Sequence, residues 1–196
     1  SHKTFSADES VIRQNLIDFS LWLENLSGKI GIDLHLGLEP EPIGHIENTA
    51  ETIAFFQRLR HQADDPDVLM RRIGLNYDTC HFAIEYDNAA ASLDALQNAS
   101  IRLSKIHLSS APTLDPRDPE AIKAIEAFDE PTYFHQVIAC GANGSVTRFI
   151  DLPYFLDAAN DEFTAARVHF HIPLDTQPSP PLGSTLPHVE ETLEWC

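Results

Sequence analysis

The chain has 196 residues, 43% of them hydrophobic, and a formal net charge of −17. This length favours one domain with a sizeable core, and so acidic a surface disfavours binding to nucleic acids or anionic membranes. No run of about 18 apolar residues is present, so we expect no membrane insertion. The three cysteines, Cys80, Cys140 and Cys196, form no CxxC pair and predict reduced thiols and a cytoplasmic protein.

The first half of the chain alternates helical and extended patterns. A capping-box pattern begins at Ser6, and apolar residues at helical spacing then predict a helix over 7–26. The stretch IGIDLHLGLE, residues 30–39, alternates apolar with polar or small residues, as a strand does. A second helix begins at Asn48, and IGLNYD, residues 73–78, predicts a second strand.

The second half continues the alternation. Asn88 can cap a helix, LSKIHL at 103–108 predicts a third strand, and ARVHFHI at 166–172 predicts a fourth. The remaining expected elements are a short helix near 118–127, a partly extended segment over 133–150 with a turn at 141–144, a helix over 151–160, and a final helix from Pro187.

Helices that alternate with strands are typical of parallel strands joined by crossover helices. Each of the four strands has one aliphatic face and one polar face, whereas a sheet covered by helices on both sides is apolar on both. In a β/α barrel one strand face lines the interior instead. The sequence therefore predicts an α/β fold in which about four parallel strands with outer helices form the C-terminal half of a TIM barrel.

A complete barrel has eight strands and about 250 residues. We therefore expect residues 1–196 to be a single barrel segment, the C-terminal part of a longer barrel. Half a barrel would expose strand edges, which predicts that the chain pairs with a second copy of itself or with the remainder of the barrel.

Polar side chains gather late in the strands, on the non-aliphatic face. They are Glu39, Asp78, His107, His169 and His171. A lone acid at a strand end usually caps a helix, and a lone histidine usually packs through a hydrogen bond. The recurrence of such side chains in four strands favours a site for a divalent metal ion. Carboxylates and imidazoles are common ligands of divalent ions such as zinc, manganese and magnesium.

Three short motifs resemble a known group. Asp78-Thr-Cys-His81 follows a strand, LGLEPEP carries Glu39, and KIHLSS carries His107. This order resembles the xylose-isomerase-like TIM-barrel superfamily, which includes sugar isomerases and epimerases and endonuclease IV. Within it, the pieces LEPEP, DTCHFAIEYD, FHQV and RVHFHIPL look most like the EboE-type metabolite-traffic proteins.

The resemblance implies roles for these residues. Glu39, Asp78 and His107 would ligate a metal, and Glu39 would also transfer a proton. His81 would bind a second metal or a substrate oxygen.

The chain departs from the pattern at its last strand. Epimerase relatives have a second strand-end glutamate there, whereas this chain has His169 and His171. Either a histidine, His171 first, replaces that ligand, or the glutamate lies beyond Cys196. His135, in FHQV, is a further candidate by resemblance to endonuclease IV.

The resulting expectation is a metal-dependent isomerase or epimerase that acts on a polyol, a sugar phosphate or another α-hydroxycarbonyl metabolite. The alternative is a non-catalytic protein that binds or transfers a metabolite. A phosphodiesterase like endonuclease IV is disfavoured because the chain is strongly acidic.

Overall fold

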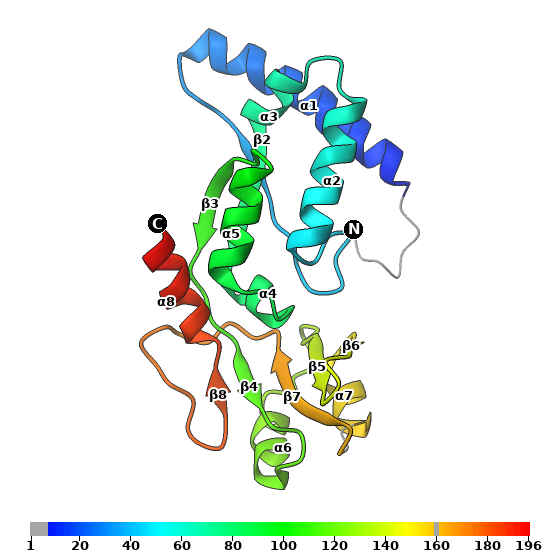
Figure 1. Ribbon diagram of the computed structural model, residues 1–196, viewed down its shortest axis with the longest axis vertical. Helices are drawn as coiled ribbons and strands as arrows, with labels where there is room; N and C mark the ends of the chain where they lie inside the picture. Colours follow the sequence, from blue (N-terminus) through cyan, green and yellow to red (C-terminus); the bar gives the residue numbers. More distant parts are fainter. Residues whose placement is uncertain (1–7, 159–160) are drawn as a thin grey trace. The chain divides into compact units, whose positions relative to one another are not determined.

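The computed structural model describes residues 8–158 and 161–196, in two compact units (Figure 1). The first unit comprises the chain up to Asp78 together with Ala91–His107. The second comprises Thr79–Ala90 together with Leu108–Cys196. Among the described residues, no helix combines the length and the apolar composition that crossing a bilayer requires.

A small parallel sheet organises the first unit. Its strands lie in the order β1 (Leu36–Leu38), β2 (Ile73–Asp78) and β3 (Leu103–His107). The helices of this unit are α1 (Glu9–Ile30), α2 (Thr49–Gln62), α3 (Pro66–Arg72) and most of α5 (Ala89–Asn98). The buried side chains are mainly aliphatic and aromatic, and include Phe55, Phe56, Leu59, Leu69, Ile73, Leu75, Tyr77, Leu93 and Leu96.

An irregularity in the pairing of β2 with β3 sets the register at the end of the sheet. Leu75 pairs with Leu103, but Asn76 already pairs with Lys105, so β3 carries one extra residue. Beyond this point Asp78 lies opposite His107. The bulge therefore places these two polar side chains at the same level of the sheet.

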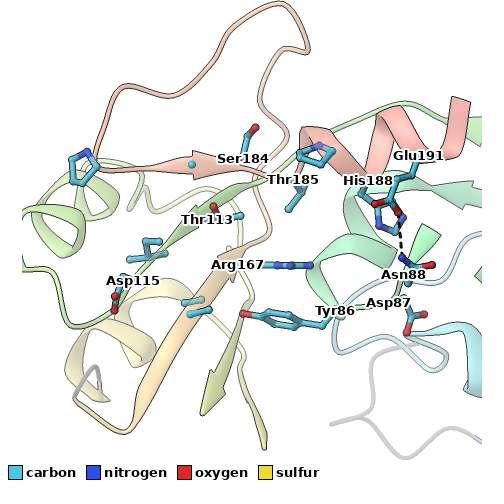
Figure 2. Close-up of a pocket in the computed structure, with 16 residues that line it drawn as sticks. Tyr86, Asp87, Asn88, Thr113, Asp115, Arg167, Ser184, Thr185, His188 and Glu191 are labelled. Atoms are coloured by element: carbon cyan, nitrogen blue, oxygen red, sulfur yellow. Dashed lines mark hydrogen bonds between the residues drawn. The ribbon is translucent and has the colours of Figure 1, made fainter. Parts of the chain in front are cut away.

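The second unit contains an antiparallel sheet with the strand order β6-β5-β7-β4-β8. Its strands are β4 (Pro112–Leu114), β5 (Val137–Gly141), β6 (Val146–Phe149), β7 (Phe163–Val168) and β8 (Gly183–Ser184). Its helices are α4 (Thr79–Ile84), α6 (Pro119–Glu126), α7 (Leu152–Ala158) and α8 (Leu186–Trp195). Thr113 of β4 pairs with both Arg167 of β7 and Gly183 of β8, in the region drawn in Figure 2.

The prediction of half a TIM barrel is wrong, and the fold is mixed α/β. Three of the four expected strands do form a parallel sheet, but the fourth, expected over 166–172, becomes β7 and runs antiparallel to both β4 and β5. The turn at 141–144, with Gly144 at a φ of +78°, folds β5 and β6 into a hairpin, and β7 adds to its free side. Alternation had indicated which residues share a face but not the direction of the partner strand.

The strand expected over 30–39 is also shorter than the pattern suggested. Ile30 is the last residue of α1, and Gly31, at a φ of +71°, ends this helix by donating its N–H to Ser27 O at 2.8 Å. At the other end of α1 the helix cap is Asp8, which accepts from the Ser10 N–H; the expected capping residue, Ser6, lies outside the described residues. Only Leu36–Leu38 then pair as a strand.

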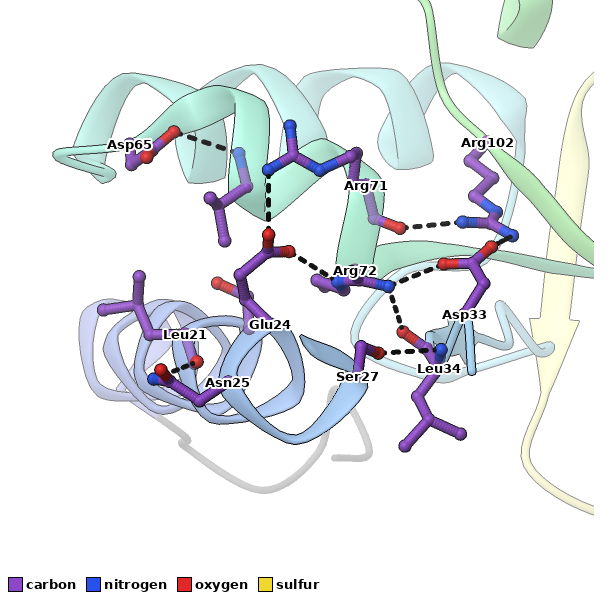
Figure 3. Close-up of polar contacts among 12 residues, drawn as sticks. Leu21, Glu24, Asn25, Ser27, Asp33, Leu34, Asp65, Arg71, Arg72 and Arg102 are labelled. Carbon is purple, nitrogen blue, oxygen red and sulfur yellow. Dashed lines mark hydrogen bonds and ion pairs between the residues drawn. The ribbon is translucent and has the colours of Figure 1, made fainter. Parts of the chain in front are cut away.

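Arg72 explains why the segment before β1 stays irregular (Figure 3). Its guanidinium donates to Glu24 at 2.7 Å, to Asp33 at 2.6 Å and to the Leu34 carbonyl at 3.0 Å. Arg102 holds the other oxygen of Asp33 at 2.8 Å, and this hydrogen bond is the main reason that the pKa of Asp33 is lowered. The Leu34 carbonyl is thus occupied, and the Leu34 N–H donates to Ser27 Oγ at 2.9 Å, so neither backbone group of Leu34 is available for strand pairing.

Candidate metal-binding site

Three polar side chains meet at the carboxyl ends of the parallel strands in the first unit. Glu39 follows the last residue of β1, Asp78 is the last residue of β2, and His107 is the last residue of β3. Parallel strands in neighbouring positions end at the same edge of a sheet, so alternation and register bring the three residues together.

The distances within this group are short. His107 Nδ1 lies 2.7 Å from Asp78 Oδ2 and 3.7 Å from Glu39 Oε1. One potential ligand atom from each of the three side chains lies within 4.8 Å of the other two. The Asp78 side chain is 0% exposed, whereas those of Glu39 and His107 are 39% and 41% exposed. The group is therefore buried on the side of Asp78 and accessible to solvent on the side of Glu39 and His107.

The donor set fits a divalent cation. Carboxylate oxygens suit manganese, imidazole nitrogen suits zinc, and a mixed set of this kind can hold either. A cation would need the carboxylate of Asp78 and the neutral imidazole of His107, because deprotonated groups are the ones that ligate metals. The group could hold a metal ion, and its affinity would then rise with pH.

A cavity of about 190 Å³ adjoins Glu39 in the same unit. Its wall is mostly apolar and includes Leu38 and Phe55, and its polar side chains are Glu39, Glu41 and His45. Glu41, two residues after Glu39 and beyond Pro40, thus lines the same space. Glu41 lies in the loop that follows β1.

The structure places the other candidate residues in the second unit. The ring of His81 lies 4.7 Å from that of His169 and 5.5 Å from that of His171, measured between centroids. Ligand atoms of Cys80, His169 and His171 lie within 4.8 Å of one another, and this group could also hold a metal ion. His169 Nδ1 lies 2.7 Å from Gln136 Oε1, a contact that orients its ring.

Sequence reasoning missed Cys80 as a potential ligand. It was interpreted as one of three reduced thiols, although it lies inside the Asp78–His81 motif. A sulfur with two imidazole nitrogens suits zinc better than magnesium. The signal that could have found it was its position directly after a strand, beside a candidate ligand.

His135 has a packing role in the second unit. It is buried, its backbone N–H donates to Asp151 Oδ1 at 2.8 Å, and its ring stacks on Phe170 at 5.3 Å. Within the described part of the chain, His135 is in none of the groups that could hold a metal.

Comparisons of the chain with protein-family models, with curated proteins and with solved structures gave no match. The resemblance to the xylose-isomerase-like superfamily therefore stays a prediction from its short motifs. The functional argument rests on the geometry of the site.

Proposed function

We propose that the first unit binds a divalent cation through Glu39, Asp78 and His107 and acts as an isomerase or epimerase on a small α-hydroxycarbonyl compound. One observation carries this proposal. Glu39 belongs to the potential ligand group and also lines the adjacent cavity, so a cation and a small molecule could meet at its carboxylate.

The residues have distinct roles in this reaction. A bound cation would polarise the carbonyl of the substrate and acidify the neighbouring C–H. Asp78 would hold it from the buried side, and His107 from the exposed side. Glu39 has two carboxylate oxygens, so it can contribute one to the ligand group and use the other as a general base for the C–H proton. Glu41, in the same cavity, is the carboxyl group available to return a proton.

The cavity narrows the class of substrate. A volume of about 190 Å³ is below the usual range of about 300–1,000 Å³ for ligand pockets, so it suits a short carbon chain. Among the described residues that line it, none is a lysine or an arginine. A phosphate group would therefore lack a positively charged partner, which favours an uncharged hydroxyketone or hydroxyaldehyde over a sugar phosphate.

Cation binding is tested first, by titration calorimetry of the metal-free chain with Mn²⁺, because Zn²⁺ would also suit the group of Cys80, His169 and His171. We expect one cation to bind in this unit, with the affinity reduced at least about 10-fold in Asp78→Asn and in Glu39→Gln. Glu41→Gln is the matched control and should keep the affinity of the wild type. Equal affinity in wild type and Asp78→Asn would contradict the proposal.

Proton transfer is tested by NMR, following deuterium uptake from D₂O at the carbon next to the carbonyl of dihydroxyacetone. Wild type with its cation should catalyse the exchange, and Glu39→Gln should slow it by about 100-fold or more. Glu41→Gln should keep the wild-type affinity for the cation and slow the return of a proton to the substrate.

The second candidate function is metabolite binding without catalysis. It is favoured by the absence, in the described residues of the ligand group, of a second strand-end glutamate. Cation binding with wild-type dependence on Glu39, together with no deuterium uptake in any hydroxycarbonyl compound tried, would support this alternative over the isomerase.

A further inference from the structure

The second unit contains a larger cavity, of about 560 Å³, that the proposed reaction does not use. Figure 2 shows its lining: side chains come from β4, β7 and β8, from the start of α8, and from the segment that follows α4. Part of the wall is apolar, with Leu114, Ala165 and Pro181, and part carries hydroxyl groups, with Thr113 and Ser184. Its size suits a small organic molecule.

Arg167 is the one lysine or arginine among the described residues that line this cavity. Its guanidinium lies beside the Tyr86 ring (Figure 2), 4.0 Å from the ring centre, and also donates to the Ala83 carbonyl. It forms no ion pair with a carboxylate in the described part of the chain. Burial lowers the pKa of Arg167, which shows that its charge is partly removed from water.

Two of the three acids that line the cavity, Asp115 and Glu191, have other partners. Asp115 receives two hydrogen bonds from the Arg117 side chain, at 2.9 Å and 2.7 Å, and these lower the pKa of Asp115 to about 2. Glu191 accepts from the Asn88 amide at 3.3 Å. Neither acid neutralises Arg167.

His188 adds no second positive charge to the cavity near neutral pH. Burial, and then the nearby charge of Arg167, lower the pKa of His188 to about 4. The lining therefore offers one guanidinium, hydroxyl groups and neutral imidazole to a ligand.

We propose that this cavity binds a small monocarboxylate, whose carboxylate group pairs with the Arg167 guanidinium. A partly buried charge is costly without an opposite charge, and the planar guanidinium matches a carboxylate. One positive charge balances one negative charge. Asp87, Asp115 and Glu191 lie around the same cavity and would repel a phosphate dianion about twice as strongly as a monocarboxylate, because the repulsion scales with the charge of the ligand. The body of the ligand would lie against the apolar part of the wall.

The rival explanation is that Arg167 is purely structural and only holds the Ala83 carbonyl and the Tyr86 ring. The two explanations differ in their response to added anions. A structural arginine needs no ligand, whereas an arginine without an acidic partner should take up a carboxylate from solution.

The test titrates the 196-residue chain with sodium butyrate, with sodium phosphate and with sodium chloride at matched ionic strength, following backbone amides by NMR. Butyrate should cause saturable shifts centred on Thr113, Arg167 and Ser184, and chloride should not. Phosphate should bind more weakly than butyrate. Tighter binding of phosphate, or no saturable shift with butyrate, would overturn the proposal.

Three variants assign the effect to the guanidinium. Arg167→Met should weaken butyrate at least about 10-fold, because a charge-assisted hydrogen-bonded pair is lost. Arg167→Lys keeps the charge but not the planar fork, so an intermediate affinity is expected. Arg60→Gln removes one positive charge from the first unit and should bind like wild type. If Arg167→Met fails to fold, the Arg167→Lys result decides: unchanged affinity there would contradict pairing through the fork.

Discussion

Two arginines in different units show how a partly buried charge can be compensated. Arg72, in the first unit, is 10% exposed and bonds to Glu24, to Asp33 and to the Leu34 carbonyl (Figure 3). Arg167, in the second unit, contacts the Ala83 carbonyl and the Tyr86 ring, of which Figure 2 draws the ring, and forms no ion pair with an acid among the described residues. The first charge is balanced within the protein, and the second lies beside a cavity.

The difference separates a structural residue from a candidate binding residue. Removing an arginine whose acids are already in place leaves those acids without their cation, so stability should fall. Removing an arginine that has no acid eliminates a desolvated charge along with its contacts, so stability should change little. The experiments below test this contrast in order of decreasing expected effect.

The largest effect is expected for Arg72→Met. Loss of three hydrogen bonds, two of them to carboxylates, should reduce the free energy of unfolding by about 3 kcal/mol, measured by urea denaturation. The matched control is Arg71→Gln on the same helix. Arg71 is 53% exposed and contacts Glu24 at 3.2 Å, so its loss should cost about 0.5 kcal/mol or less. Equal losses of unfolding free energy in both variants would contradict the structural role assigned to Arg72.

The next effect is a dependence of stability on pH through His188. Its pKa is about 4 in the folded chain, against an ordinary value of 6.5, so the unfolded chain binds more protons between these values. Stability should therefore fall as the pH is lowered from 6.5 toward 4. From pH 7 to pH 5 the loss from this residue should be roughly 2 kcal/mol.

This contribution is measured as the difference between wild type and His188→Gln across that pH range. Because Arg167 helps to lower the pKa of His188, the loss should shrink in Arg167→Met. An unchanged pH dependence in His188→Gln would show that other groups are responsible.

A smaller effect is expected for Arg167→Met at neutral pH without added carboxylate. The cation–π contact and the hydrogen bond to Ala83 are lost, but so is the cost of a partly buried charge. We expect the free energy of unfolding to change by less than about 1 kcal/mol. A loss as large as that of Arg72→Met would instead identify Arg167 as structural.

The smallest effect is expected for Tyr86→Phe. The hydroxyl donates to the Ile138 carbonyl at a long 3.3 Å, so its removal should cost about 0.5 kcal/mol. The ring that faces the guanidinium remains, and butyrate affinity should stay at the wild-type value. A marked loss of affinity would mean that the hydroxyl, rather than the ring beside Arg167, contributes to binding.

Local patterns predicted the second and third strands of the parallel sheet, and they placed the carboxyl ends of all three strands to within one residue. The second and third strands were expected at 73–78 and 103–108 and occur at Ile73–Asp78 and Leu103–His107. Glu39, Asp78 and His107 were expected to converge because parallel neighbours end at one edge, and the structure brings them together. Their roles as ligands, and the proton transfer by Glu39, stay predictions.

Features that depend on segments far apart in the chain could not be predicted from local sequence patterns. The alternation of ARVHFHI fits a strand of either direction, and only its pairing with Val137–Gly141 fixes β7 as antiparallel. The alternating pattern begins at Ile30, but Ile30 is the last residue of α1 and Gly31 ends this helix. The first residues of the pattern are therefore not part of a strand. The cavity around Arg167 is lined by four separate stretches of the chain, so no single sequence motif predicts it.

The route of the chain between the units has a practical consequence for dissecting the protein. The backbone passes from one unit to the other after Asp78, after Ala90 and after His107. A fragment that stopped at His107 would keep Cys80 and Ile84 but lose Ala111 and Ile138, on which they pack. Excising 79–90 instead would require joining Asp78 to Ala91, in the first turn of α5, and would remove the start of this helix. Neither unit is a contiguous stretch, so truncation will not yield separate working halves, and point variants in the whole chain are the way to assign function.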